Sequence, residues 1–505
     1  MDLDTAPKMY SADGAEKGEL GRSSVSYLGV ERPMDQCDED GHVRRTGTFM
    51  TATSHIVTAV IGAGVLSLAW ATAQMGWIAG PIAIMMFSFI TLYCAFLLCD
   101  CYRLCYDWPG NFEGRRLYTY MGAVRAYLGP NYVAFCGIIQ HANLVSTSIG
   151  YTVTSGQALA AVYRAHCYHY TPDALAMLPA ESGTVPCYPT INKYMIIFGA
   201  IELVFIQLPD MDRIWWLSIF CAIMSLTYST IGLGLVIAKS TETDPEGGRG
   251  TIDGVKGDTD YYGKQWDIML ALGNIAFAYS FNFILIEISD TVRGPQENKV
   301  MKKASLCGII ITTFFYISIG CIGYSAYGNG VAGNLLTGFG IVNPWWLVML
   351  ANLSIVLHLI GGYQVWTQPF LALVEDSVNK WFPNVKFLTS AINVPLPGMG
   401  NVQISLFRLV WRSVYVCIVT FIALLAPFFN DIVGIMGSLG FWPLTVFLPI
   451  EMHIAQRGVP RFSMKWILLQ MLSAFCAVIS VAAMIGSIAG IIKDTEGYII
   501  FHASY

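Results

Sequence analysis

The chain has 505 residues, of which 55% are hydrophobic and only 12% are charged. Its apolar residues fall in repeated blocks of about 20, the length that a helix needs to cross a bilayer. This composition excludes a soluble globular protein. The net charge of −5 says little about partners, because in a membrane protein the positions of the charges along the chain matter more than their sum.

Residues 1–45 are polar and contain no apolar run, so we expect a disordered N-terminal tail without a cleavable signal peptide. The apolar segments that follow predict an all-α polytopic membrane protein with a transmembrane domain at 46–492 and a short tail at 493–505. The eleven predicted spans are 47–75, 77–101, 131–161, 191–208, 214–238, 266–289, 304–326, 344–374, 404–426, 430–450 and 464–492.

The placement of Lys and Arg predicts the orientation. An odd number of spans puts the two ends of the chain on opposite sides of the membrane. With the N-terminus in the cytosol, most of the 29 Lys and Arg residues fall on the inner side, as the positive-inside rule requires. Those on the predicted outer side are Arg164, Lys193, Lys239, Arg249, Lys256, Lys264 and Lys493. We therefore expect a cytosolic N-terminus and an extracellular C-terminus.

Cysteine use agrees with this orientation. Of the 13 cysteines, only Cys167 and Cys187 share an outward loop, where an oxidising environment favours a disulfide. The neighbouring His166 and His169 fit no tetrahedral pattern, so we expect no metal site. No nucleotide-binding loop, zinc-protease motif or serine nucleophile motif occurs, so we expect neither an enzyme nor ATP-driven transport, no cofactor and no nucleic-acid partner.

Two spans are interrupted by residues that hold a helix poorly. The first carries Gly62-Ala63-Gly64 near its middle, and the sixth carries small, polar and aromatic residues at 278–282. A break at membrane depth exposes backbone groups that protein, water or a ligand must satisfy. Interrupted spans five apart predict a five-plus-five inverted repeat, plus one extra helix, with a ligand held at the midplane. A glycine packing notch between intact helices is the alternative reading.

Long motifs carry a resemblance to a known family. They are GTFMTATSHIVTAVIGAGVLSLAWATAQMGW at 47–77, NLVSTSIGYTVT at 143–154, IAFAYSFNFILIEISDT at 275–291, PQENKVMKKA at 295–304, HLIGGYQVWTQP at 358–369 and PFFNDIVGIMGSLGFWPLTVFLPIEMHI at 427–454. With these motifs the chain resembles the plant amino acid permeases, a branch of the amino acid/auxin permease family. The resemblance implies an eleven-span carrier with the broken-helix amino acid transporter fold, which imports amino acids with protons at the plasma membrane.

The two breaks suit the charges of an amino acid. The positive N-terminal end of the half-helix after Gly64 can take the carboxylate, and open carbonyl groups around Ala278 to Ser280 can take the ammonium group. The aromatic residues Tyr279, Phe281 and Tyr363, which are among the expected substrate contacts, could each be ordinary packing residues instead. By analogy with the family, the expected substrate-binding residues are Thr58, Gly62, Ala63, Gly64, Asn143, Thr147, Asn274, Ala278, Tyr279, Ser280, Phe281 and Tyr363.

Three positions depart from the family pattern. Asn274 replaces an acidic residue, Ala63 stands where serine is common, and Glu202 stands where glutamine is expected. Losing one carboxylate and gaining another can change which amino acids bind or where a proton sits. The range of substrates therefore does not carry over from the family.

Ionisable residues inside the spans are candidates for proton coupling, since they are costly to keep there. An imidazole titrates at a pKa of about 6.5 and can load a proton outside and release it inside. We rank His55 first, because it lies two helical turns before the first break, with His358 and Glu202 behind it. His141 is more typical of a neutral histidine that satisfies a neighbouring carbonyl group. The same purely structural reading is open for the other three.

Two further functions stay open. A transporter-like sensor would bind an amino acid and signal through cytosolic partners, although the 45-residue tail and the short loops offer little room for a signalling domain. An uncoupled facilitator would share the fold but not the proton coupling.

Overall fold

The computed structural model describes residues 45–104, 114–171, 187, 189–207, 215–241, 249–255, 261–339, 344–383, 385–396 and 400–496. Apart from Arg45, the predicted N-terminal tail lies outside the described residues, and so do residues 497–505 of the predicted C-terminal tail.

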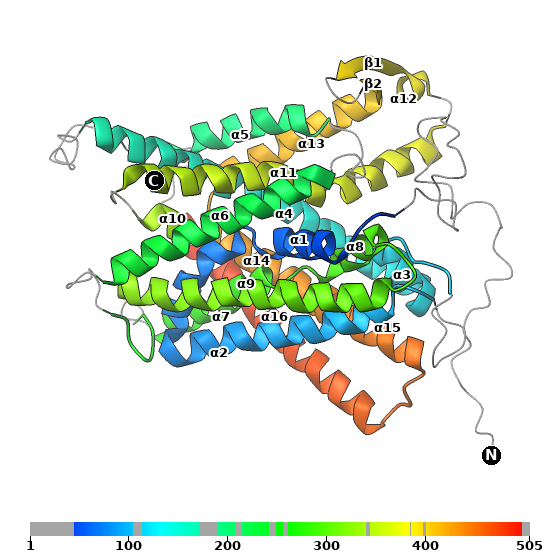
Figure 1. Cartoon of the computed structure of the whole chain (residues 1–505), viewed down its shortest axis with the longest axis horizontal. Helices are drawn as coiled ribbons and strands as arrows, with labels where there is room; N and C mark the ends of the chain where they lie inside the picture. Colours follow the sequence, from blue (N-terminus) through cyan, green and yellow to red (C-terminus); the bar gives the residue numbers. More distant parts are fainter. Residues whose placement is uncertain are drawn as a thin grey trace.

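The described chain is a bundle of helices whose long members run side by side (Figure 1). The long helices are α2 (Gly64–Asp100), α4 (Pro130–Tyr170), α6 (Trp215–Ser240), α9 (Glu297–Tyr327), α11 (Trp345–Trp381), α13 (Leu406–Leu425) and α16 (Met464–Thr495). The shorter ones are α1 (Phe49–Val60), α3 (Tyr120–Leu128), α5 (Ile191–Phe205), α7 (Tyr261–Ala278), α8 (Leu285–Thr291), α10 (Leu335–Gly338), α12 (Lys386–Thr389), α14 (Phe429–Gly440) and α15 (Leu448–Arg457).

Three irregular turns complete the helical elements of the described residues. The 3₁₀ turn η5 (Asn282–Ile284) precedes α8, and η6 (Gly328–Gly330) follows α9. A π-helical turn, η7 (Phe441–Phe447), joins α14 to α15. Turns of this kind inside a long helix shift the register of the backbone hydrogen bonds and often mark functional regions.

The predicted all-helical architecture is confirmed, with one short hairpin added among the described residues. Strands β1 (Ala391–Leu396) and β2 (Gly400–Ser405) pair antiparallel between α12 and α13, with Ala391 opposite Ser405. This hairpin lies between the eighth and ninth predicted spans, except that its last two residues, 404 and 405, belong to the ninth. Short strands are possible there because water can satisfy the outer edges of a hairpin, which lipid cannot do.

Eight helical segments of the described chain are long and apolar enough to cross a membrane. The first predicted span is divided between α1 and α2, and α2 continues through a kink at Gly76, where φ is +82°, into the second. The fourth corresponds to α5, which has only 15 residues. The prediction of eleven spans is therefore supported in its general form, as a polytopic helical bundle, and the number stays a prediction.

The outer surface of the bundle is apolar. Large side chains such as Phe314 on α9, Phe421 on α13 and Val478 on α16 are more than half exposed. An exposed apolar surface of this extent is unfavourable in water and suits contact with lipid chains.

Small residues bring the inner helices close together. A Cβ atom at Gly273 of α7 would lie 2.8 Å from the carbonyl oxygen of Gly434 on α14, so only glycine permits this spacing. α1 packs against α6, α8 and α9 and lies in the middle of the bundle (Figure 1). The interrupted segments are thus enclosed by the longer helices.

Candidate functional site

The first interruption separates α1 from α2. The chain leaves helical geometry at Ile61, where ψ is 86°, and α2 begins at Gly64 without a side-chain cap at Ala63. The N–H groups at the start of a helix have no partner within that helix. This end of α2 therefore presents donors and the positive end of a helix dipole inside the bundle.

The second interruption follows α7. Regular helix ends at Ala278, and the chain passes through Tyr279 to Phe281 before η5 and α8 begin. Ser280 turns its hydroxyl back to the carbonyl oxygen of Ala276, at 2.7 Å. Asn282 donates to the carbonyl oxygens of Thr91 and Thr445, at 3.3 and 3.2 Å, and so ties this link to α2 and η7.

The two interruptions meet at a glycine. A Cβ atom at Gly64 would lie 2.8 Å from Cα and 3.0 Å from Cβ of Ala278. On the other side of the same turn, a Cβ atom at Gly62 would lie 3.6 Å from the hydroxyl oxygen of Tyr151 and 3.9 Å from Nε2 of His358. Gly64 therefore packs on the second break, and Gly62 faces α4 and α11.

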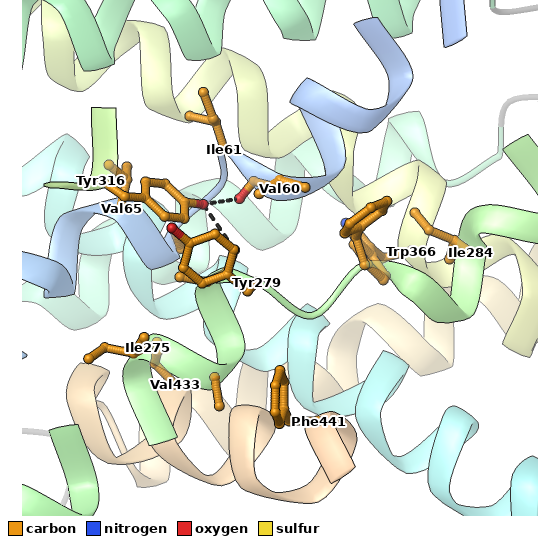
Figure 2. Packing of buried hydrophobic residues seen from close by; sticks show 14 of the residues in the cluster. Val60, Ile61, Val65, Ile275, Tyr279, Ile284, Tyr316, Trp366, Val433 and Phe441 are labelled. Carbon is orange, nitrogen blue, oxygen red and sulfur yellow. Dashed lines mark hydrogen bonds between the residues drawn. The ribbon is translucent and has the colours of Figure 1, made fainter. Parts of the chain in front are cut away.

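Two tyrosines satisfy the carbonyl groups at the breaks. The Tyr316 hydroxyl contacts the carbonyl oxygens of Val60, at the end of α1, and Ala278, at the end of α7 (3.0 Å). Figure 2 shows Tyr316 with its neighbour Tyr279 beside Val60. The Tyr228 hydroxyl contacts the carbonyl oxygens of Ile61 and Gly62, at 3.1 and 3.0 Å.

The prediction of open carbonyl groups at the second break needs correction. The Ala278 carbonyl is engaged by Tyr316, and that of Tyr279 accepts from the N–H of Phe281 at 3.2 Å. Buried carbonyl groups find donors within the protein because an unpaired one is costly. Each carbonyl oxygen has a second lone pair, so a ligand can still bind, but the tyrosines hold these groups in place beforehand.

Sequence analysis missed Tyr151, Tyr228 and Tyr316. Tyr228 and Tyr316 lie in mainly apolar segments and Tyr151 in the motif at 143–154, and nothing in the sequence distinguishes any of the three from a packing residue. A buried tyrosine usually finds a partner for its hydroxyl, which is a general signal but does not say where that partner lies.

The two predicted residues on α4 form hydrogen bonds with backbone carbonyl oxygens. Asn143 donates to the carbonyl oxygen of Met436 on α14 at 2.7 Å, and Thr147 donates to the carbonyl oxygen of Asn143 at 2.8 Å. Both are buried; the Asn143 bond holds α4 against α14, and the Thr147 bond stays within α4. Thr58 is buried on α1, one turn before the break.

Two predicted residues have side chains with unmet hydrogen bonds. Asn274 lies one turn before Ala278, is fully buried, and has no hydrogen-bond partner for either side-chain atom within the described residues. Tyr363 is buried on α11 and packs edge-on against Phe198, with its hydroxyl also unpaired among those residues. Unpaired polar atoms inside a protein are expected where a ligand or water binds.

The four candidate ionisable residues occupy different surroundings. His358 is fully buried on α11, and its Nδ1 lies 3.1 Å from the carbonyl oxygen of Cys221. A carbonyl group only accepts, so Nδ1 carries the hydrogen and Nε2, the atom facing Gly62, is left to take a proton. His55 lies on α1 and is only partly buried.

The other two lie away from the breaks. His141 has Nδ1 2.6 Å from the carbonyl oxygen of Gly137 and packs against Phe370, as its structural reading predicts. Glu202 is fully buried on α5 and accepts from Nε2 of Gln364 at 2.7 Å, while its Oε1 has no partner within the described residues. This pair joins α5 to α11.

The predicted cysteine pair forms in the structure. Cys167, in the last turn of α4, is joined to Cys187 by a disulfide. His169 stacks on Trp345, the first residue of α11, with ring centroids 4.2 Å apart. Among the described residues, no group of three or more His, Cys, Asp or Glu side chains is arranged to hold a metal ion.

Fold and site together define a polytopic helical membrane protein with two interrupted helices in contact. The fold is similar to that of MhsT, solved in complex with L-phenylalanine, with a TM-score of 0.52 and 11% sequence identity. This similarity covers 88% of the present chain and 100% of MhsT.

The chain belongs to the family described as transmembrane amino acid transporter protein, whose model matches residues 45–493. Its relatives include amino acid permease 3 of Arabidopsis thaliana, 48% identical over 93% of this chain and 95% of the relative. Amino acid permease 2 of the same plant is also 48% identical, over 94% of each chain, and amino acid permease 4 is 47% identical over 95% of this chain and 100% of the relative. It is therefore a member of a family of transporters and not of enzymes.

Proposed function

We propose that the protein is a secondary active transporter that carries amino acids into the cell together with protons, by alternating access. The observation that carries the proposal is the contact of the two breaks at Gly64 and Ala278, which sets the N-terminal end of α2 beside the C-terminal ends of α1 and α7. An amino acid needs both kinds of helix end, one for each of its charges. The permease names of the relatives support the substrate class.

In this proposal the carboxylate binds the free N–H groups at Ala63 and Gly64, where no side-chain cap competes for them. The ammonium group binds near Gly62 and Ser280, on the second lone pairs of carbonyl oxygens already held by neighbouring groups. The remaining proposed contacts are Thr58, Asn143, Thr147, Asn274, Ala278, Tyr279, Phe281 and Tyr363. No charged side chain is required at the site.

We assign the coupling proton first to His358. Its Nε2 has no hydrogen-bond partner within the described residues and faces Gly62, so a proton bound there would act directly on the first break. His55 is farther along α1 and partly exposed, which leaves it as a second candidate. Glu202 is the third candidate. Its buried carboxyl group pairs with the Gln364 amide and not with a cation, so an ionised Glu202 would be a buried charge without a counter-charge. Burial of this kind favours the protonated form, which can carry a proton.

The transmembrane domain at 46–492 is proposed to have eleven spans in two inverted halves and one extra helix, with a cytosolic N-terminus in the plasma membrane. One end of the bundle carries a group of ion pairs, including Arg45 with Asp290 and Arg103 with Glu297, at 2.8 and 2.6 Å. Basic residues gather at the cytosolic end of membrane proteins, which supports this orientation. These pairs would then close the inner side of the carrier.

The test is uptake of a panel of radiolabelled amino acids by transport-deficient yeast at two external pH values. A proton symporter is expected to accumulate the amino acid above its external concentration. This accumulation should be greater at the lower external pH. Uptake that only equilibrates would identify a facilitator instead. Binding without uptake would favour the sensor.

A further inference from the structure

Four carbonyl groups converge where α1 and α7 end. They belong to Val60, Ile61 and Gly62 at the first break and to Ala278 at the second. Carbonyl oxygens at the C-terminal end of a helix carry the negative end of its dipole. In broken-helix carriers such unwound carbonyl groups and half-helix ends coordinate the coupling cation.

In this chain two neutral hydroxyl groups take that place. Tyr316 reaches the site from α9 and touches both breaks, while Tyr228 reaches it from α6 and touches only the first. Both side chains are fully buried. Each hydroxyl has a single hydrogen to share between two carbonyl oxygens, so the cluster holds more acceptors than donors.

The two hydroxyls are held by packing against other residues of the site. The Tyr316 ring meets Tyr279 edge-on, with centroids 5.1 Å apart, and the Tyr228 ring meets His358 edge-on at 5.8 Å. Neither hydroxyl can withdraw without disturbing these contacts. A metal cation would therefore have to displace a fixed oxygen atom to reach the carbonyl groups.

We propose that Tyr316 and Tyr228 are positioning residues whose hydroxyl groups fill the cation sites of the two breaks, so that Na⁺ has no place there and the carrier works without it. The idea rests on the proposed transport function and adds a determinant of ion selectivity to it. Tyr316 is the more important of the two, because one atom links both broken helices. Proton coupling is then left to a separate titratable group.

The test replaces Tyr316 by serine, which removes the ring and draws the hydroxyl oxygen back toward α9, away from the two carbonyl groups. Uptake of a radiolabelled amino acid is measured with NaCl, LiCl and choline chloride at equal ionic strength and pH. We expect the parent protein to take up substrate equally in all three salts. The Tyr316→Ser variant should be stimulated by Na⁺ or Li⁺, because the carbonyl oxygens of Val60 and Ala278 become available to a small cation.

A matched control lies on the same helix. The Tyr324 hydroxyl accepts from the backbone N–H of Thr251 at 2.8 Å, away from the breaks, so Tyr324→Phe should behave as the parent protein in every salt. A parent protein that needs Na⁺ for uptake overturns the proposal. An active Tyr316→Ser variant at normal surface level with no response to either cation overturns it too.

If Tyr316→Ser does not reach the cell surface, the Tyr316→Phe variant tests the positioning role of the hydroxyl group instead. Loss of the hydroxyl that positions both breaks should raise KM about tenfold at unchanged surface level, the effect of one buried hydrogen bond. An unchanged KM overturns the positioning role.

Failure of the proposed transport function would give a different result, since the parent protein would then take up no amino acid in any salt. In that case the thermal unfolding of purified protein in NaCl against choline chloride still reports whether Na⁺ stabilises Tyr316→Ser alone.

Discussion

Single residues at the breaks decide what can approach them. Gly62 and Gly64 are separated by one residue but face different neighbours: Gly62 faces His358 and Tyr151, and Gly64 faces Ala278. A side chain at either position would fill space that the proposed substrate needs. Close approach requires glycine at Gly64, where a Cβ atom would lie 2.8 Å from Cα of Ala278, whereas a Cβ atom at Gly62 would make only ordinary contacts, and neither residue has a positive φ.

Replacing Gly64 by leucine should abolish uptake while the protein still reaches the membrane. The first added carbon would already lie 2.8 Å from Cα of Ala278, so the two breaks must separate, and leucine also favours a continuous helix. The measurement is uptake normalised to surface protein. Gly234→Leu is the control, since a Cβ atom at Gly234 on α6 has nothing within 4 Å. Normal uptake by Gly64→Leu would remove the proposed site.

His358→Gln should separate coupling from binding. Glutamine can keep the bond to the Cys221 carbonyl but cannot take up a proton beside Gly62. Uptake should lose its dependence on external pH and its ability to concentrate substrate, while exchange of internal for external amino acid persists. His141→Gln should leave both properties unchanged. If His55→Gln shows the loss and His358→Gln does not, the proton is carried on α1 instead.

At the level of helices and strands, local features could be predicted from the sequence, but contacts between distant segments could not. The breaks were predictable because Gly62-Ala63-Gly64 and residues 278–282 interrupt apolar runs. Such local residues disfavour a helix by themselves, whichever helices pack nearby. The pairing of Cys167 with Cys187 followed from a shared loop. The tyrosine bonds and the surroundings of His358 were not predictable, because they depend on which helices pack together. The hairpin was missed since β1 and β2 are short and lie between spans.

The start of α1 is fastened to the end of α8 by backbone and side-chain bonds together. The Gly47 N–H donates to the carbonyl of Thr291 at 3.0 Å, and the Arg293 N–H donates to that of Gly47 at 2.9 Å. Asp290 accepts from both Arg45 and Tyr102, each at 2.8 Å. These bonds would have to open for a substrate to leave on that side.

Asp290→Ala should loosen this closure more than Arg45→Ala. The aspartate holds two donors from different parts of the chain, whereas Arg45→Ala leaves its bond to Tyr102 intact. Amide hydrogen exchange over residues 47–54 should be faster in both variants, and fastest in Asp290→Ala. The two residues share one ion pair, but Arg45 also donates to the backbone carbonyl oxygen of Asp290 at 2.7 Å, so the double variant should exceed Asp290→Ala by less than the full effect of Arg45→Ala. Equal effects of the two single variants, adding fully in the double, would mean that the residues act independently.

The whole molecule shows an asymmetry between its surfaces. The interior of the bundle is lined with polar side chains that hydrogen-bond to backbone, such as Thr147 and Ser148 on α4, whereas the outer faces of α13 and α16 expose large apolar ones. The interior as a whole is still mainly apolar, so the difference from a soluble protein lies in the apolar outer surface, and the two breaks lie away from it. The breaks then lie inside a shell of long helices, which suits the proposed alternating access.

The orientation of this shell can be tested on α16, whose two ends are both exposed. Phe462 precedes the helix on the side predicted to be cytosolic, and Lys493 lies in its last turn on the side predicted to be extracellular. In Phe462→Cys and Lys493→Cys variants, a membrane-impermeant maleimide should label residue 493 in intact cells and residue 462 only after permeabilisation. The added label is judged against the parent protein, whose Cys417 is exposed on the apolar face of α13. Labelling of 462 alone in intact cells would invert the proposed topology, and labelling of both would mean that α16 does not cross the membrane.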